Sequence, residues 1–91
     1  MEVRWSLNAA DDLERIVRFI QQDDPEAARR VARTIYERAT GLQTFPNRGR
    51  PGRVDDTREL ALPPLPFIIV YRVLPGAVEI ARIIHGAQRW P

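Results

Sequence analysis

The residues best suited to chemistry gather near the C-terminal end of the chain, in RIIHGAQRW, from Arg82 to Trp90. This stretch holds the only histidine, His85, between Arg82 and Arg89. An imidazole has an ordinary pKa near neutrality, about 6.5, so it can act as a general acid or a general base. Arginine can hold the oxygens of a phosphate. The three side chains therefore fit a metal-free ribonuclease, in which one group takes a 2′-hydroxyl proton and cations stabilise the scissile phosphate.

The same stretch also fits a surface that binds another protein. Trp90 lies next to the end of the chain, where backbone is normally loose unless something holds it. Tryptophan and arginine dominate the binding hot spots of protein interfaces. The indole is expected either to fold back on a sheet or to anchor a partner, and the imidazole to pack at a strand end, contact a partner or catalyse. The candidate partner-binding residues are Arg58, Arg72, Arg82, His85, Arg89 and Trp90.

Metal and cofactor chemistry finds no support in the residue types. One histidine, no cysteine and scattered carboxylates do not form a ligand set. The loop Asn47–Arg53 contains two glycines but lacks the lysine and the following helix of a phosphate-binding loop. We therefore predict neither a metal nor a cofactor.

Length and composition favour one small domain, residues 1–91, with one hydrophobic core, because the chain has 91 residues and 44% hydrophobic content. The absence of cysteine fits a reducing compartment. No apolar run approaches the ~20 residues that cross a bilayer, and the N-terminus lacks the residue order of a signal peptide. A cytoplasmic protein without a membrane partner is the expectation.

All fourteen basic residues are arginine, and the excess of positive charge lies in the second half of the chain. Residues 47–91 carry seven arginines against four acids, whereas residues 1–46 carry seven against eight. An anionic partner should therefore meet the second half. Six arginines either form one positive side that meets such a partner or are ordinary surface charges partly paired with Asp55, Asp56 and Glu79: Arg48, Arg50, Arg53, Arg58, Arg72 and Arg82.

The elements that must position these side chains begin with a short strand, Glu2–Ser6, whose apolar residues alternate. A helix then follows, with Asn8 as its expected N-cap and with Asp11 and Asp12 as first-turn carboxylates that the helix dipole favours. Its apolar residues recur at helical spacing and predict one buried stripe: Leu13, Ile16, Val17 and Ile20.

A second helix should pack beside the first as a tight hairpin. Asp24 and Pro25 end the first helix and begin the second, since aspartate is a good N-cap and proline suits the first helical position. Apolar residues continue at helical spacing to Leu42, and Phe45-Pro46 marks the end of the segment. The loop Asn47–Arg53 follows.

Three runs with strand composition complete the chain: Thr57–Leu62, Phe67–Val73 and Val78–His85. The connections are about four residues long, so these strands should form an antiparallel meander. The predicted fold class is α+β, in the order β-α-α-β-β-β, with a helical hairpin packed on one sheet. Alternation places Arg58 on the face opposite to Glu59, and Arg72 and Arg82 on adjacent strands.

This order, and several local sequences, resemble the RelE/ParE superfamily of bacterial type II toxins. The resemblance covers nearly the whole chain and rests on AADDLERIVRFI, PEAARRVARTIYERATGLQTFPNRGRPG, TREL, FIIVYRV and the ending IARIIHGAQRWP. It implies a toxin that a cognate antitoxin neutralises by wrapping it with a C-terminal segment, as a hetero-oligomer. In the ParE branch the implied target is DNA gyrase, and in the RelE branch the toxin cuts messenger RNA on the ribosome. One fold serves both activities, so the site must decide.

Three positions favour the ParE-like, plasmid-stabilisation branch. Ribosome-dependent relatives place an arginine at the start of the penultimate strand, and by ungapped comparison that position here is Ile68. They also carry acid or base residues on the preceding strand, where this chain has Glu59 and Ala61. We therefore predict a toxin that inhibits gyrase by binding. The alternatives are an mRNA endoribonuclease that uses His85, Arg82 and Arg89, and a non-toxic structural partner in an antitoxin complex.

Overall fold

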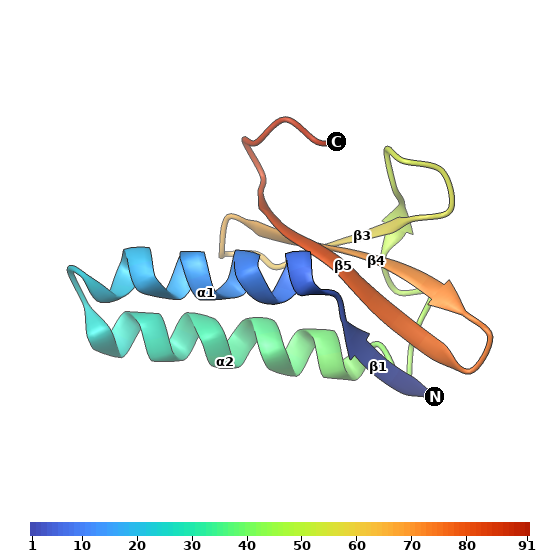
Figure 1. The fold of residues 1–91 in the computed structure, drawn as a ribbon, viewed down its shortest axis with the longest axis horizontal. Coiled ribbons are helices and arrows are strands. Elements are labelled where there is room, and N and C mark those ends of the chain that lie inside the picture. Colours follow the sequence, from blue (N-terminus) through green and yellow to red (C-terminus); the bar gives the residue numbers. More distant parts are fainter.

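A helical hairpin and a five-stranded sheet make up the fold in the computed structural model, which describes residues 1–91 (Figure 1). This architecture confirms the predicted α+β class and element order. A two-residue strand lies inside the segment expected to be a loop, so that part of the prediction is wrong. In chain order the elements are β1 (Glu2–Trp5), α1 (Leu7–Gln21), α2 (Pro25–Gly41), β2 (Arg50–Pro51), β3 (Arg58–Ala61), β4 (Phe67–Leu74) and β5 (Ala77–His85).

The sheet has the strand order β1-β5-β4-β3-β2. β3, β4 and β5 form the predicted antiparallel meander. β1 pairs in parallel with β5, with Trp5 opposite Ile80, so the sheet is mixed and not purely antiparallel. A parallel pair needs a long crossover, which the helical hairpin and the meander provide. The first and the last strand of the chain therefore lie side by side.

A β-bulge in β5 determines the direction of the C-terminal side chains. Val70 lies opposite Arg82 and Tyr71 lies opposite Ile80, so Ala81 is an extra residue on β5. The extra residue resets the alternation between the two faces of the sheet, so the residues before and after Ala81 follow opposite patterns of alternation.

Helix α1 begins two residues earlier than the expected cap, Asn8, implies. Its N-cap is Ser6, whose hydroxyl accepts the backbone N–H of Ala9 at 3.0 Å, and Asn8 is an exposed residue within the helix. The prediction of Asn8 as the cap is therefore wrong, because the chain leaves β1 directly into the helix without a connecting turn. In α2 the predicted cap is confirmed: the Asp24 carboxylate accepts the N–H of Ala27 at 3.1 Å. Neither helix is long and apolar enough to cross a membrane.

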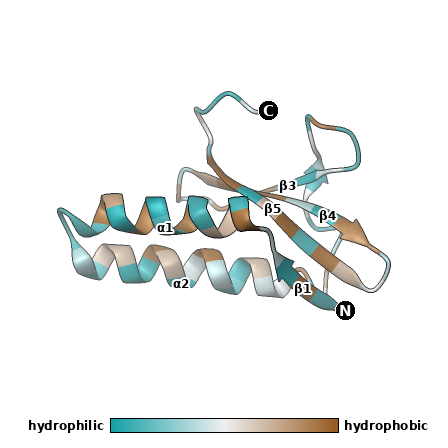
Figure 2. Cartoon of the chain, in the orientation of Figure 1, coloured by the Kyte–Doolittle hydropathy of each residue, from teal (hydrophilic) through white to brown (hydrophobic).

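The main core lies between the sheet and the helical hairpin. Figure 2 shows hydrophobic residues along parts of β4 and β5, and hydrophobic and hydrophilic residues alternating along α1. Tyr71 in β4 is the largest fully buried side chain. The buried residues of this core are Ala9, Ile35, Ala39, Leu42, Leu60, Leu62, Ile69, Tyr71, Val78, Ile80 and Ile83.

The sheet face turned away from this core, called the open face below, carries a second and smaller cluster. Ile68, Val70 and Ile84 form this open-face cluster, and all three are buried although no helix covers them. The partly buried side chain of Trp90 packs against them. The end of the chain therefore folds back over the open face, one of the two arrangements expected for this tryptophan.

Candidate functional site

His85 and Arg82, the two central residues of the ribonuclease hypothesis, lie on opposite faces of the sheet. Ile83 belongs to the core on the helix side and Ile84 to the open-face cluster, which fixes the direction of alternation after the bulge. Arg82 therefore lies on the open face, as Ile84 does, and His85 lies on the helix side, as Ile83 does. In register, His85 lies opposite Phe67, whose side chain packs against the helix-side core.

Arg82 forms an ion pair with a buried carboxylate on α1. Its Nε donates to Oδ2 of Asp12 at 2.7 Å and its Nη2 donates to Oδ1 at 3.1 Å. The Asp12 side chain is only 3% exposed and that of Arg82 27%. The hydrogen bonds to Asp12 raise the pKa of the Arg82 guanidinium above its usual value. Asp12 is therefore the buried partner of an arginine on β5, and not simply a carboxylate that complements the helix dipole.

Residues at the start of α1 also form hydrogen bonds with the backbone groups of β5 that lie beyond the end of β1. The backbone N–H of Ile83 donates to Oδ2 of Asp12 at 2.9 Å. The Ser6 hydroxyl donates to the carbonyl of Ala81 at 2.9 Å, and the Ser6 backbone N–H donates to the carbonyl of Ile80 at 3.0 Å. Two polar side chains thus replace the strand that would otherwise pair with this edge.

Glu59 lies on the open face, at the other end of the sheet, and is only 2% exposed. It accepts the backbone N–H of Arg53 at 3.0 Å and lies within 3.3 Å of the guanidinium groups of Arg50 and Arg53. Burial raises the pKa of the Glu59 carboxyl, but the Arg53 N–H and the two guanidinium groups outweigh burial and hold it below its usual range. Glu59 is therefore a carboxylate whose charge is already paired, and its contacts with Arg50 and Arg53 fix the loop before β3.

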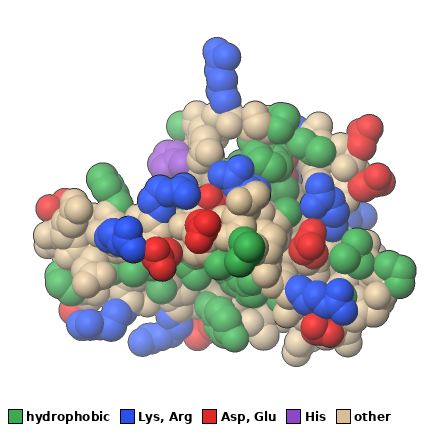
Figure 3. Space-filling model, in the orientation of Figure 1, with side chains coloured by type: hydrophobic (Ala, Val, Ile, Leu, Met, Phe, Trp, Pro, Cys, Tyr) green, Lys and Arg blue, Asp and Glu red, His purple; other side chains and the backbone are tan.

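Two further arginines of the predicted surface are also engaged. Arg72 on β4 pairs with Glu79 on β5 at 3.3 Å, on the open face. Arg58 lies in register with Tyr71, on the helix side of the sheet, as alternation predicts, and donates to the carbonyl of Gly49 at 2.7 Å. The predicted positive side is thus divided between two faces. Figure 3 likewise shows arginines interspersed with carboxylates over the visible face.

The hydroxyl of Tyr71 closes the loop between α2 and β3. It accepts the backbone N–H of Gly49 at 2.8 Å and donates to the carbonyl of Pro46 at 2.7 Å. Burial raises the pKa of this hydroxyl. A Cβ atom at position 49 would lie 2.7 Å from the Tyr71 oxygen and 3.0 Å from the carbonyl of Glu59, so only glycine fits here.

His85 lies at the exposed end of β5. Its Nδ1 accepts the backbone N–H of Ala87 at 3.1 Å, which leaves the proton of the neutral ring on Nε2. The ring meets Phe67 edge to face, with 5.8 Å between centroids. The imidazole therefore packs at a strand end and fixes the turn that follows it.

A largely apolar groove of about 580 Å³ runs from His85 along α1. Phe19, 72% exposed, stands at its margin. The one arginine that shares the groove with the imidazole is Arg15, whose side chain is 71% exposed and lies 3.4 Å from Asp12. The other residues that line the groove are Asp12, Ile16, Ile20, Val31, Leu65, Pro66, Phe67, Ile83 and Gln88.

The tail, residues 86–91, leaves β5 through a turn and crosses to the open face. The backbone N–H of Gly86 donates to the carbonyl of Pro66 at 2.7 Å, and that of Gln88 donates to the carbonyl of His85 at 2.9 Å. Trp90 then reaches the open-face cluster, where the guanidinium carbon of Arg82 lies 5.3 Å from its ring centroid. Arg89 is exposed.

The structure brings together only part of the predicted partner-binding set. Arg72, Arg82 and Trp90 line one hollow on the open face, together with Glu79. Arg58 lines a different hollow, which it shares with Arg72, and His85 and Arg89 lie in neither hollow. Sequence reasoning missed Asp12 as a partner of Arg82, although a signal was present: Asp12 belongs to the same helical stripe as Ala9, Leu13 and Ile16, where a carboxylate needs a buried partner.

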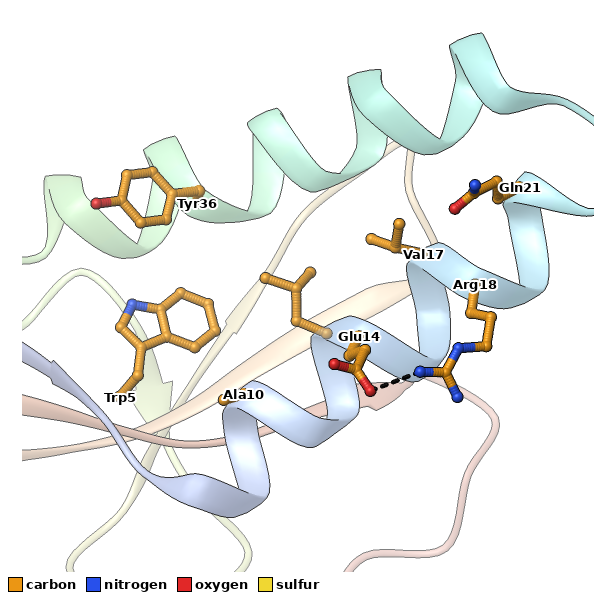
Figure 4. A pocket seen from close by; sticks show the side chains of 8 residues that line it. Trp5, Ala10, Glu14, Val17, Arg18, Gln21 and Tyr36 are labelled. Carbon is orange, nitrogen blue, oxygen red and sulfur yellow. Dashed lines mark hydrogen bonds and ion pairs between the residues drawn. The ribbon is translucent and has the colours of Figure 1, made fainter.

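A second groove, of about 550 Å³, lies between the two helices (Figure 4). The indole of Trp5 and the ring of Tyr36 stack at one end, 6.3 Å apart and 12° from parallel. Glu14 and Arg18 pair at 2.7 Å along its margin. Neither charged residue points at a partner across the groove in Figure 4, so the groove offers apolar contact more than chemistry.

Comparison with known proteins identifies the family. Residues 3–90 match the family model described as the ParE toxin of the type II toxin-antitoxin system parDE. A protein called putative toxin Y4kP, from Sinorhizobium fredii, is 44% identical over 98% of this chain and 92% of its own length. Toxin RelE2 of Caulobacter vibrioides is 39% identical over 96% of this chain and 97% of its own length.

A solved structure agrees with the sequence matches. It is described as a chromosomal ParDE TA system from P. aeruginosa and superimposes with a TM-score of 0.86 at 33% identity. The match covers 93% of this chain and 95% of that one. The chain described here therefore belongs to the ParE toxin family of type II toxin–antitoxin systems.

Proposed function

We propose that this protein is a toxin that acts in the cytoplasm by binding DNA gyrase, and that a cognate antitoxin neutralises it. The family match and the similarity to a ParDE system support this proposal. One observation on the site itself carries it: Arg82 and His85, which a ribonuclease would need side by side, face opposite ways from β5.

The electrostatics of the open face point in the same direction. Arg72 and Arg82 are each paired with a carboxylate, and Glu59 neutralises the charge of one of the two loop arginines beside it. A guanidinium that already holds a carboxylate is a weak ligand for a second anion. At the position where ribosome-dependent relatives carry an arginine, Ile68 lies beneath Trp90.

Gyrase poisoning can be tested with the purified protein. Supercoiled plasmid, gyrase and ATP are incubated with the toxin, and detergent and protease then release any trapped DNA breaks as linear plasmid. We expect linear DNA to accumulate with toxin concentration. Normal turnover of gyrase without linear DNA would contradict the proposal.

The histidine provides a matched control for the activity. His85→Ala removes the only imidazole and leaves the ion pairs of the open face in place. We expect this variant to stop growth and to trap gyrase as the wild type does. A variant that folds but no longer stops growth would favour chemistry at His85.

Messenger RNA cleavage is the second candidate function, because one relative carries the name toxin RelE2. Primer extension on translated messages after induction of the toxin tests it directly. Cuts at regular positions within codons, lost in His85→Ala, would replace the gyrase proposal. If cells that express the toxin alone grow normally, the protein is instead a non-toxic structural partner of its antitoxin.

The antitoxin is expected to be the product of a neighbouring reading frame. Co-expression of the two genes should yield a stable hetero-oligomer and restore growth. A neighbouring product that neither binds nor protects would remove that gene as the candidate partner.

A further inference from the structure

The end of the tail is held on the open face by its indole alone. The turn after β5 has four hydrogen bonds, which involve His85, Gly86, Ala87, Gln88 and the carbonyl of Pro66. None of the hydrogen bonds in the structure involves residues 89–91. The contact between the Trp90 ring and the open-face cluster therefore decides whether the tail stays in place.

The place that Trp90 occupies suits the ring but not its polar group. The indole nitrogen Nε1 is buried and has no hydrogen-bond partner, and it is the only buried side-chain polar atom in the structure in this condition. A buried donor without an acceptor destabilises the arrangement. The pocket thus selects a flat apolar ring and discriminates against the N–H group.

Arg82 contributes the polar side of this pocket. Asp12 holds the guanidinium from α1 through two hydrogen bonds, so the orientation of the guanidinium does not depend on the tail. Its carbon lies 5.3 Å from the centroid of the Trp90 ring, within the range of a cation–π interaction. The receptor half of the contact is therefore formed without help from the tail.

We propose that the open-face cluster and the Arg82 guanidinium form a binding site for an aromatic side chain of a partner protein. Trp90 fills this site in the free chain and is displaced when the partner binds. The occupant that the site favours is a ring without a buried donor, such as the phenyl group of a phenylalanine. Because the residues that form the site are on this chain, the proposal holds whatever the cellular target is.

The test uses the full-length chain with Trp90→Ala, which empties the site without shortening the protein. The probe is the free peptide Ala-Gln-Arg-Trp-Pro, added while the methyl resonances of Ile68, Val70 and Ile84 are followed by NMR. We expect saturable shifts with a dissociation constant of about 1 mM or below, because Trp90 fills the site from a short linker, whose effective concentration is on the order of 1 mM. The wild-type chain, whose site is filled, should show no such shifts.

The unpaired indole N–H of Trp90 allows a more specific second test. In a second peptide, benzothienylalanine replaces tryptophan and so substitutes sulfur for the N–H group while keeping the shape of the ring. We expect it to bind at least about fivefold more tightly, since no donor is buried. Equal affinities would mean that the N–H finds a partner and that the proposed preference is wrong.

Substitutions of two arginines that line the same hollow distinguish a specific site from nonspecific binding. In the Trp90→Ala chain, Arg82→Gln should weaken peptide binding several-fold, because it removes the cation over the ring. Arg72→Gln, which affects the neighbouring pair with Glu79, should leave it unchanged. Identical effects of the two substitutions, or shifts of similar size in the wild-type chain, overturn the proposal.

A measurement on the unmodified protein covers the case in which a variant does not fold. The indole N–H of Trp90 should exchange slowly with solvent and resonate upfield of a hydrogen-bonded indole, as a buried donor without an acceptor does. Rapid exchange in the wild type would show that the ring does not occupy the site, and the proposal would fall.

Discussion

The Arg82 guanidinium on β5 and the Asp12 carboxylate on α1 form a two-pronged ion pair, with Nε–Oδ2 at 2.7 Å and Nη2–Oδ1 at 3.1 Å. The pair joins the helical hairpin to β5 next to the bulge. From the sequence, Arg82 is a candidate for binding a phosphate or a partner. In the structure it holds Asp12, and its guanidinium lies over the ring of Trp90.

Asp12→Ala should therefore lower the free energy of unfolding by about 2–3 kcal/mol, because Arg82 and the N–H of Ile83 lose a charged acceptor. Urea unfolding measures the change. Asp11→Ala is the matched control, since Asp11 is the exposed neighbour and should change stability by less than about 0.5 kcal/mol. Equal losses in the two variants would contradict the structural role of the pair.

Ser6, and not Asn8, caps helix α1. Ser6→Ala should destabilise the protein by about 1–2 kcal/mol, because the hydroxyl accepts the N–H of Ala9 and donates to the carbonyl of Ala81. Asn8→Ala should be nearly neutral. Thermal melts of the two variants decide which residue caps the helix, and the reverse order of melting temperatures would restore Asn8.

Tyr71→Phe tests the closure of the loop before β3. The substitution leaves the buried N–H of Gly49 and the carbonyl of Pro46 without their partner, and we expect a loss of about 1–2 kcal/mol in urea unfolding.

Gly49→Ala should destabilise the same loop, because its Cβ would collide with Tyr71 and with the backbone of Glu59. Gly41→Ala is the control of the same chemistry, since its Cβ meets only a side-chain atom of Arg48 at 3.8 Å. Alanine is also the better helix former, so this variant should be neutral or slightly more stable. A neutral Gly49→Ala would show that the loop does not pack against Tyr71 in solution.

Glu59 should make stability depend on acid pH. Its carboxyl pKa is lower in the folded protein than the usual value of 4.5, so the stability that it contributes is fully present above that value and is lost as the pH falls through the folded pKa. The difference in unfolding free energy between the wild type and Glu59→Gln should therefore be largest near neutrality and shrink below about pH 4.5. A difference that stays constant between pH 7 and pH 3 would mean that the arginines do not stabilise this carboxylate.

Local patterns predicted the elements but not the contacts between distant ones. Helix α1, the Asp24 cap and the meander from Arg58 onward follow from residue spacing and short connections, and the structure confirms them. The predicted stripe of α1 is only half-buried, and the buried residues of that helix are Ala9 and Asp12. Asp12 and Arg82 are seventy residues apart in the sequence. Periodicity indicates which face of a helix or strand a residue occupies, but not which distant side chain it contacts.

The bulge at Ala81 limited the site prediction for a related reason. One extra residue reverses every later side chain on the strand, so a strict alternation from Val78 would put His85 on the wrong face. The tail was open to two interpretations because an indole near a chain end fits both a fold-back contact and an interface.

The pairing of β1 with β5 has a consequence for how this protein is made. β5, the last strand in the chain, lies between β1 and β4, so during translation β1 has no partner strand until both helices and strands β2, β3 and β4 have been made. A chain that ends before β5 cannot join β1 to the other strands, so any activity that requires the complete sheet begins only once β5 has paired on both of its edges.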